Sequence, residues 1–259
     1  MSSKKRIRRE RISTLVSERG AISVGALAEL LDVSMQTIRR DIDALCEEGG
    51  LRRQHGRVEL KGKRLNAPFD ERAGTNPAAK RAIGEAAARL IDDGASLFLS
   101  IGSTPLSVAK ALQQHKELTV ITNNLSAAMA LSDEVSNRII LPAGELRLPD
   151  RDILGDDVLD FFGQYRAEFA IFGVAGVAED GGMLDFHSAE VRVREQMRRN
   201  AQRSVLVLDS TKFGRLAPAA GGNVVDVDHV IFDRLPSKKF ASLTKRFEQR
   251  MLIAEEEMV

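Results

Sequence analysis

Short apolar runs of strand length alternate with longer helical patterns along most of this chain, from Pro77 onward. The apolar runs lie at residues 96–102, 118–122, 138–141, 169–174, 204–208 and 229–232. The helical patterns lie at residues 78–92, 104–114, 124–132, 153–163 and 188–201. Alternation of this kind predicts a mainly parallel, doubly wound α/β sheet. Ligands of such sheets bind beyond the carboxyl ends of the strands.

Two of the predicted strands end in small polar residues that lead into a helix. Gly102, Ser103 and Thr104 follow the first strand, and Asn123 and Asn124 follow the second. Glycine permits close approach of the backbone, and free N–H groups at a helix start attract an anion. Each turn alone also fits an ordinary capped connection. Two in succession favour a shared phosphate pocket, whereas the missing G-x-G-x-x-G fingerprint argues against dinucleotide binding.

A different polar pattern occupies residues 33–45. Ser34 is placed to cap a helix, and three apolar residues share one helical stripe, namely Ile38, Ile42 and Leu45. The opposite side and its flank carry Gln36, Arg39, Arg40 and Asp43. Amide and guanidinium groups on an exposed helix face read base edges and grip phosphates in the DNA major groove. The segment is therefore predicted to be a recognition helix.

The neighbouring residues complete a helix-turn-helix unit with a wing. Apolar spacing predicts a first helix that ends near Gly20 and a second over 24–31, joined to the recognition helix by a tight turn. Residues 51–60 resemble a basic β-hairpin with Gly56 at its turn. The candidate DNA contacts are Ser34, Gln36, Thr37, Arg39, Arg40, Arg52, Arg53, His55 and Arg57.

Charge is distributed unevenly along the chain, although the formal net charge is only +1. Residues 1–64 contain 15 Lys and Arg against 9 Asp and Glu, and the remaining residues contain 23 against 28. A basic head on an acidic body is typical of a phosphate-binding module joined to a domain that does not bind DNA. Residues 62–76 contain glycine, proline and charges without periodicity, which predicts a linker.

Several classes of protein are disfavoured by the composition. The single Cys46 excludes an internal disulfide and fits a reducing compartment, and the four histidines show no metal-ligand spacing. No apolar run approaches the length of a membrane span. We therefore expect a cytoplasmic protein without a membrane segment, a metal ion or a cofactor.

The motifs together resemble those of one protein family. V-S-M-Q-T-I-R-R-D-I at 33–42 and L-R-R-Q-H-G at 51–56 resemble the N-terminal signature of the DeoR/GlpR family of bacterial transcriptional regulators. Its C-terminal effector domain is resembled by residues 118–125, 173–190 and 208–214. Two places depart from the family pattern, since Arg57-Val58 replaces a glycine and a small residue, and residues 143–146 lack one of two glycines.

The resemblance implies three parts and a set of site residues. The parts are a winged helix-turn-helix domain over 1–61, the linker over 62–76 and a Rossmann-like α/β effector domain over 77–259. The last would be similar to ribose-5-phosphate isomerase and the CoA transferases, with a phosphorylated sugar as effector. The phosphate would be held by Gly102, Ser103, Thr104, Asn123 and Asn124. Glu190 and Lys212 would face the sugar with Asp209 nearby, although a loop salt bridge is the alternative for Asp209 and Lys212.

Three functions compete for this chain. The first is a repressor of a carbohydrate catabolism operon, acting as a homo-oligomer on repeated or palindromic DNA half-sites. The second is an isomerase with Glu190 or Asp209 as base and Lys212 stabilising an enediolate. The third is an activator or nucleoid-type DNA binder without an effector. The DNA-binding head favours the regulator, because an isomerase has no use for it.

Overall fold

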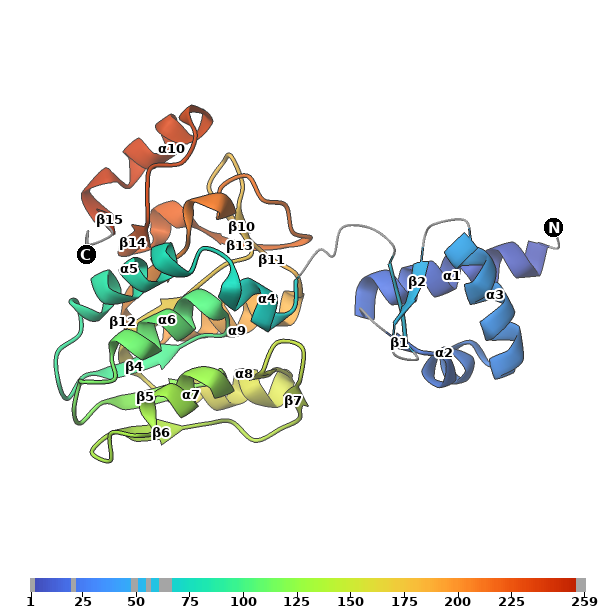
Figure 1. Cartoon of the computed structure of the whole chain (residues 1–259), viewed down its shortest axis with the longest axis horizontal. Coiled ribbons are helices and arrows are strands. Elements are labelled where there is room, and N and C mark those ends of the chain that lie inside the picture. The colour runs from blue at the N-terminus through green and yellow to red at the C-terminus, as the bar shows by residue number, and fades with distance from the viewer. Residues whose placement is uncertain (1–2, 20–21, 48–50, 55–56, 61–66, 255–259) are drawn as a thin grey trace. The chain divides into compact units, whose positions relative to one another are not determined.

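The computed structural model describes residues 3–19, 22–47, 51–54, 57–60 and 67–254. The chain divides into two compact units, Met1–Leu65 and Asn66–Val259, which are called the N-terminal unit and the C-terminal unit below. Figure 1 shows both units, with labels on many of their helices and strands. Each unit has a hydrophobic core of its own.

The N-terminal unit combines helices with a small antiparallel sheet. The helices are α1 (Ser3–Arg19), α2 (Val24–Leu31) and α3 (Met35–Glu47). The strands are β1 (Ile22–Ser23), β2 (Leu51–Gln54) and β3 (Arg57–Leu60), in the order β1-β3-β2. This confirms the predicted helix-turn-helix with a β-hairpin after it. The short strand β1 was not predicted, and the proposed hairpin turn at Gly56 lies outside the described residues.

Side-chain caps and one left-handed residue define the helix-turn-helix. Ser23 Oγ accepts from the N–H of Ala26 at 3.1 Å and so starts α2. Asp32 ends α2 with a left-handed backbone at φ 50°. Ser34 Oγ accepts from the N–H of Thr37 at 3.2 Å at the start of α3, as its position in the sequence predicts.

The core of the N-terminal unit forms where the predicted apolar stripe of α3 meets α1, α2 and the sheet. Its largest buried side chains are Ile12, Val16, Ile22, Leu27, Ile38, Ile42, Leu45, Leu51 and Val58. The buried Asp41 of α3 accepts from Arg8 Nε at 2.6 Å and from Arg9 Nε at 3.3 Å. These ion pairs fix α3 against α1, so the remaining face of α3 is presented on a rigid support.

A seven-stranded parallel sheet forms the centre of the C-terminal unit, in the order β15-β14-β12-β9-β4-β5-β6. Its strands are β4 (Ser96–Leu99), β5 (Thr119–Thr122), β6 (Arg138–Ile140), β9 (Ala167–Phe172), β12 (Ala201–Val207), β14 (His229–Phe232) and β15 (Met251–Ile253). The order reverses between β4 and β9, because β5 and β6 extend the sheet one way and later strands extend it the other way. The predicted doubly wound fold is confirmed.

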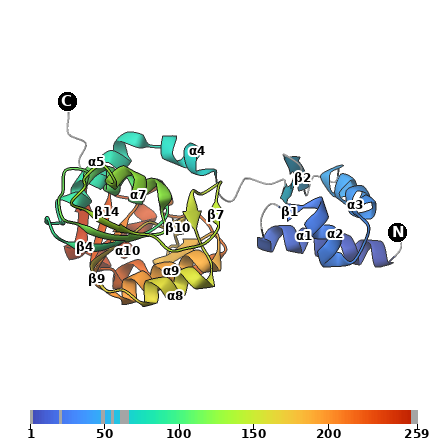
Figure 2. The same ribbon diagram turned by 90° about the horizontal axis from the view of Figure 1, so that it is seen from below.

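Helices cover both faces of this sheet (Figure 2). One face carries α5 (Pro77–Ala88), α6 (Ser103–Ala111) and α7 (Leu125–Leu131), and the other carries α8 (Asp156–Gly163) and α9 (Ser188–Arg199). Successive residues of a strand point to opposite faces, so in β4 Leu97 and Leu99 join the first layer while Phe98 packs against α8 and α9. Because both faces are buried, the strands are continuous apolar runs.

The predicted linker over 62–76 is wrong in its second half. Residues 69–74 form helix α4 (Phe69–Gly74), which belongs to the C-terminal unit. Phe69 is only 2% exposed, and its N–H donates to the carbonyl of Pro149 at 2.9 Å. A helix of one and a half turns has too few residues to show periodicity, and its docking depends on residues far away in the sequence.

Several short elements at the rim of the sheet were also not predicted. They are the hairpin β7 (Leu146–Arg147) and β8 (Asp152–Ile153), the antiparallel sheet of β10 (Gly176–Val177), β11 (Gly182–Asp185) and β13 (Ala219–Asn223), helix α10 (Ala241–Arg246), and the 3-10 helices η1 (Ser210–Lys212), η2 (Val224–Asp226), η3 (Lys238–Phe240) and η4 (Glu248–Arg250). Two-residue strands carry no alternation that a sequence can display. None of the described helices is long and apolar enough to span a bilayer.

Candidate ligand pocket and DNA-binding surface

A pocket opens beyond the carboxyl ends of β4 and β9, where the strand order of the central sheet reverses. Loops diverge at such a reversal, so it is the usual ligand site of open α/β sheets. The pocket is walled by the residues after β4, β9 and β12, by α4 and by the start of α9. Five of the eight predicted ligand-binding residues line it, namely Gly102, Ser103, Thr104, Glu190 and Lys212.

The turn after β4 brings the start of a helix into this pocket. Gly102 has φ +117°, a conformation that L side chains rarely adopt. Helix α6 begins at the next residue, and the N–H of Leu106 closes its first turn on the carbonyl of Gly102 at 3.2 Å. The N–H groups of a first helical turn have no partner inside the helix. Ser103 and Thr104 are buried, so an anion at this turn would be partly shielded from water.

The two asparagines after β5 do not line the pocket. Asn124 accepts from the N–H of Ala127 at 3.1 Å and so caps α7. Its Nδ2 donates to the carbonyls of Ser100 and Gly102, both at 3.2 Å, which braces the turn after β4. Asn123 instead donates to the carbonyl of Ile153 at 2.9 Å. Both oxygen and nitrogen of the Asn124 side chain are thus engaged by backbone groups, whereas the buried Oδ1 of Asn123 has no hydrogen-bond partner among the described residues.

Lys212 reaches the pocket from η1, the 3-10 helix that follows β12. The predicted alternative, a salt bridge with Asp209, is not formed, and Asp209 instead caps η1 by accepting from the N–H of Thr211 at 3.1 Å. No hydrogen bond or ion pair engages the Lys212 ammonium within the part of the chain that the structure describes. Burial lowers the pKa of Lys212 to about 8, and the charge of Asp209 opposes that shift. Three nearby cations lower the pKa further, namely Arg215, Lys80 and Arg72.

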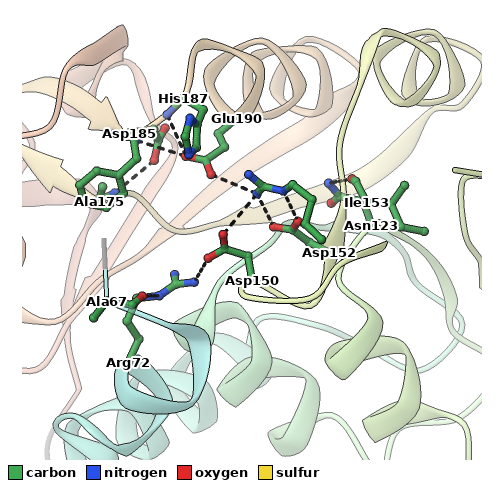
Figure 3. A network of polar contacts seen from close by, with 12 residues as sticks. Ala67, Arg72, Asn123, Asp150, Asp152, Ile153, Ala175, Asp185, His187 and Glu190 are labelled. Carbon is green, nitrogen blue, oxygen red and sulfur yellow. Dashed lines mark hydrogen bonds and ion pairs between the residues drawn. The ribbon is translucent and has the colours of Figure 1, made fainter. Parts of the chain in front are cut away.

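A network of ion pairs forms one wall of the pocket between α4 and α9 (Figure 3). At its centre, Arg147 Nε donates to Asp152 Oδ1 at 2.7 Å, and Arg147 Nη2 donates to Glu190 Oε1 at 3.2 Å. Asp150 accepts from Arg72 Nη2 and also lies 3.8 Å from Arg147. Burial raises the pKa of Asp152, whereas Arg147 lowers it. The network thus joins the β7–β8 turn to both flanking helices.

Glu190 has a structural role in addition to lining the pocket. Its Oε2 accepts from the N–H groups of Phe186 and His187, both at 3.2 Å. A glutamate at the third position of a helix that reaches back in this way stabilises the helix start. Because its Oε1 also accepts from Arg147, the Glu190 side chain is held at the N-terminus of α9 by both of its oxygens.

A buried arginine also lines the pocket. Arg194 is 2% exposed, and its Nη1 donates to Asp185 Oδ2 at 2.7 Å. Its Nη2 donates to the carbonyl of Gly221 at 2.5 Å, which ties α9 to the small antiparallel sheet. Burial raises the pKa of Asp185 to about 6, although Arg194 and the N–H of Ala175 both favour the ionised form. Of the two, Arg194 favours the carboxylate more strongly.

Sequence reasoning missed most of the charged residues of the pocket. Those lining it are Arg72, Asp150, Asp152, Asp185, Arg194 and Arg215. Arg147 connects Asp150 and Asp152 to Glu190. The signal that could have found some of them is the dense charge of R-L-P-D-R-D at 147–152. This run lies between the predicted strand at 138–141 and the predicted helix at 153–163. No three His, Cys, Asp or Glu side chains among the described residues are placed to hold a metal ion.

The outward face of α3 carries the predicted recognition residues. Those exposed are Ser34, Gln36, Arg39 and Arg40, and Thr37 is half-buried. Arg40 forms no hydrogen bond or ion pair among the described residues, which leaves its guanidinium available on this face. The structure therefore presents the polar face on the side that the apolar stripe predicts.

The hairpin contributes arginines beside the same helix. Arg53 of β2 lies 3.0 Å from Asp43 and donates to the carbonyl of Arg39 at 3.2 Å, so it fastens the hairpin to α3. Arg57 is exposed on β3, whereas Arg52 is half-buried on the other side of β2. The remaining predicted contact, His55, lies outside the described residues.

Comparison with protein families gives two matches that together cover most of the chain. A DeoR-like helix-turn-helix domain matches residues 8–64, and a DeoR C terminal sensor domain matches residues 75–234. The first contains the recognition helix and the hairpin, and the second contains most of the residues around the pocket.

Two transcriptional repressors agree with these matches, and one solved structure is more distantly similar. The glycerol-3-phosphate regulon repressor of Escherichia coli (strain K12) is 40% identical over 225 residues, covering 87% of this chain and 89% of that protein. The HTH-type transcriptional repressor CsqR of the same organism is 34% identical over 250 residues, covering 96% of each. Ribose 5-phosphate isomerase A of Methanocaldococcus jannaschii is 18% identical over 54% of this chain and 56% of that one, with a TM-score of 0.40. On the family matches and the curated relatives, the chain belongs to the DeoR family and is a DNA-binding transcriptional regulator, not an enzyme.

Proposed function

We propose that this regulator is a repressor of carbohydrate metabolism genes whose operator binding is changed by a small phosphorylated metabolite. The observation that carries the proposal is the meeting of an open helix start and an available lysine ammonium in one pocket. Helix N-termini and buried lysines are both suited to phosphate. A relative that is 40% identical is named for the glycerol-3-phosphate regulon, and this name supports phosphorylated polyols and sugars as candidates.

The phosphate would lie against the turn of Gly102, Ser103 and Thr104, with Lys212 as its main counter-charge. Asn124 supports that turn, and Asp209 fixes the helix that carries Lys212. Both would therefore position ligand-binding groups without touching the ligand, and Asn123 would act one step further back. Glu190 and Asp152 line the same pocket and offer acceptor oxygens to sugar hydroxyls.

The affinity for such a phosphate is expected to fall as pH rises above about 8, the pKa of Lys212. Below that pH Lys212 already carries its proton in the free protein. Above it the free protein has lost this proton, and because a bound dianion raises the pKa of Lys212, binding takes up a proton. By linkage, affinity falls by up to about tenfold per pH unit between the free and bound pKa values. The phosphate itself titrates near pH 6 and stays dianionic in this window. Titration calorimetry at pH 7 to 9.5 measures the effect, which a flat profile would contradict.

The N-terminal unit is proposed to bind the operator with α3 in the major groove. Gln36 and Arg40 would reach base edges, and Arg39, Ser34 and Thr37 would lie towards the backbone. The flanking hairpin would add phosphate contacts from Arg52, Arg53, His55 and Arg57. Arg53 also fastens the hairpin to α3, so its substitution would mix two effects.

Arg40→Ala is expected to weaken specific operator binding by roughly 1–3 kcal/mol, because a bidentate base contact is lost. Binding to unrelated DNA should fall much less. The measurement is a fluorescence titration with operator and scrambled duplexes at one salt concentration. Lys110→Ala, which removes an exposed cation from the C-terminal unit, is the control. Unchanged operator affinity in the Arg40 variant would exclude this arginine from base reading.

The regulator is further proposed to act in the cytoplasm as a homo-oligomer, a dimer or a tetramer. One recognition helix covers only a few base pairs, so specificity on a genome requires two or more half-sites held at a fixed spacing. Light scattering of the free protein and of its operator complex tests this. A monomer bound one-to-one would refute it.

The proposal as a whole is tested by a mobility-shift assay on the DNA upstream of the protein's own gene. The protein is titrated alone and with sn-glycerol 3-phosphate, glucose 6-phosphate, ribose 5-phosphate and inorganic phosphate. Release of the DNA by one organic phosphate, but not by its unphosphorylated parent, is the expected result. A specific complex that no phosphorylated compound changes would instead favour a DNA binder without an effector.

A further inference from the structure

Helix α4 is held against the turn between β7 and β8, which forms part of the pocket wall. The N–H of Phe69 donates to the carbonyl of Pro149 at 2.9 Å, and the Phe69 ring is buried. One turn further along α4, Arg72 Nη2 donates to Asp150. Arg72 and Asp150 both line the pocket. A ligand in the pocket would therefore lie beside the contact that docks this helix.

The turn itself is held in a strained conformation by the same helix. Arg151 has a left-handed backbone at φ 55°, which is costly for a residue other than glycine. Its guanidinium lies 2.8 Å from Asp70 and over the ring of Phe69, at 5.5 Å from the centroid. Both partners belong to α4, so loss of the docking contact would free the turn to relax. A ligand that breaks the docking contact would therefore favour a relaxed arrangement of the turn over the one observed.

Arg72 also fixes the beginning of the C-terminal unit. Its Nε donates to the carbonyl of Ala67 at 2.9 Å (Figure 3). Its own carbonyl accepts from the buried Lys80 Nζ, which also donates to the carbonyl of Thr75 at 2.7 Å. In the sequence, Ala67 comes directly after residues 61–66, which connect β3 to the C-terminal unit. One guanidinium thus joins the pocket to the chain that leads from the DNA-binding unit.

Resting on the function proposed above, we propose that Arg72 exchanges its partner Asp150 for the phosphate of the ligand. This exchange is the signal that the ligand has bound. A phosphate dianion offers more charge and more acceptor oxygens than one carboxylate, and guanidinium pairs with it in the same forked geometry. When Arg72 turns to the ligand, the Asp150 contact is lost and the bond to Ala67 is disturbed. Ligand binding then changes how α4 and the preceding segment are held.

The first test is a double-mutant cycle on the full-length protein with Arg72→Ala, Asp150→Asn and both together. The probes are the four phosphates named above, with binding followed by calorimetry. Arg72→Ala should weaken binding roughly 10- to 100-fold, the value of a charge-assisted hydrogen bond. Asp150→Asn should tighten it about 3- to 10-fold, because the ligand no longer competes with a carboxylate.

The ligand affinity of the double variant is the decisive measurement. If Asp150 acts by occupying Arg72, Asp150→Asn has no effect once Arg72 is alanine. If it acts only as a negative charge near the pocket, the tightening persists in the double variant and the inference is overturned. Asp156→Asn removes a carboxylate from an exposed ion pair with Arg192 and is the matched control, with affinity expected to equal that of the parent protein.

The second test separates ligand binding from signalling. Arg72→Lys keeps a cation for the phosphate but lacks the second nitrogen that bonds the carbonyl of Ala67 while the first bonds Asp150, so ligand binding has no Ala67 bond to disturb. We expect ligand affinity within about fivefold of the parent, since a point charge still binds phosphate. Saturating ligand should nevertheless release much less operator in the mobility-shift assay. Full release by this variant would overturn the signalling role of Arg72.

Different results would contradict the proposed ligand class and the proposed role of Arg72. If the parent protein binds its operator but none of the four phosphates, the proposed ligand class is wrong and the role of Arg72 falls with it. If the parent responds to a phosphate and all Arg72 and Asp150 variants respond equally, only the present inference is wrong. Circular dichroism melting curves for each variant show whether it is folded.

Discussion

Replacing Arg194 with methionine is expected to lower the free energy of unfolding of the C-terminal unit by about 3–5 kcal/mol. Methionine fills a similar volume and keeps the apolar stem, so the loss comes from charge and hydrogen bonding. Asp185 would remain in a buried position without its guanidinium partner. The carbonyl of Gly221 would lose its donor as well. A loss of this size is a large share of the total stability of a typical domain.

Urea unfolding followed by far-ultraviolet circular dichroism measures the effect, since the chain has no Trp and one Tyr. Arg192→Met is the matched control on the same helix. Arg192 pairs with Asp156 at 2.9 Å, but both side chains are exposed, so a loss below about 1 kcal/mol is expected. Equal stability of the two variants would show that the buried pair contributes nothing beyond its volume.

The loss of unfolding free energy in the Arg194→Met variant, called its deficit below, should depend on pH in a defined direction. In the parent protein the pKa of Asp185 is about 6 even with Arg194 beside it, and it rises further without that charge. A carboxyl whose pKa is raised on folding binds its proton more tightly in the folded state, so stability falls as pH rises through that pKa. The deficit is therefore expected to be largest above pH 7 and smaller at pH 5. A deficit that grows on acidification would point to another cause.

Replacing Lys212 with methionine is expected to abolish the ligand response while making the protein more stable. The ammonium is the counter-charge proposed for the phosphate, and truncating one partner of a buried charged contact costs about 2–5 kcal/mol of binding. Without ligand the same ammonium lowers the free energy of unfolding, because it is partly buried with no partner for its charge among the described residues. Its pKa is lowered from 10.5 to about 8, and at pH 7 that corresponds to at most about 3 kcal/mol of destabilisation. That cost is present below pH 8 and fades above it, as the folded protein releases the proton.

Two measurements on one variant test this. The mobility-shift assay should show normal operator binding with no release at ligand concentrations that saturate the parent protein, and the melting temperature should rise. Lys239→Met is the control, because Lys239 is exposed and pairs with Glu179 at 3.3 Å. Loss of stability in the Lys212 variant would mean that the ammonium has a structural partner.

Elements whose burial repeats with a regular period were predictable from the sequence. Strands with both faces buried are continuous apolar runs, so six strands of the central sheet were located from sequence. The α3 stripe of Ile38, Ile42 and Leu45 gave the buried side of the recognition helix and, by exclusion, its polar side. The turn at Gly102 was identifiable because glycine and hydroxyl residues follow a strand and precede a helix.

Only the tertiary structure decided which charged side chains meet. Arg72 and Asp150 are 78 residues apart, and Arg147 and Glu190 are 43 residues apart. A periodic pattern records how one element faces the core, whereas an ion pair depends on how two distant elements are placed. Asn123 and Asn124 show the same limit, since their residue types suit phosphate, whereas their side-chain N–H groups donate to backbone carbonyls. The sequence thus determined the two domains and the family of this protein. The wall of its pocket was decided by packing, because polar contacts between remote segments leave no periodic trace in the chain.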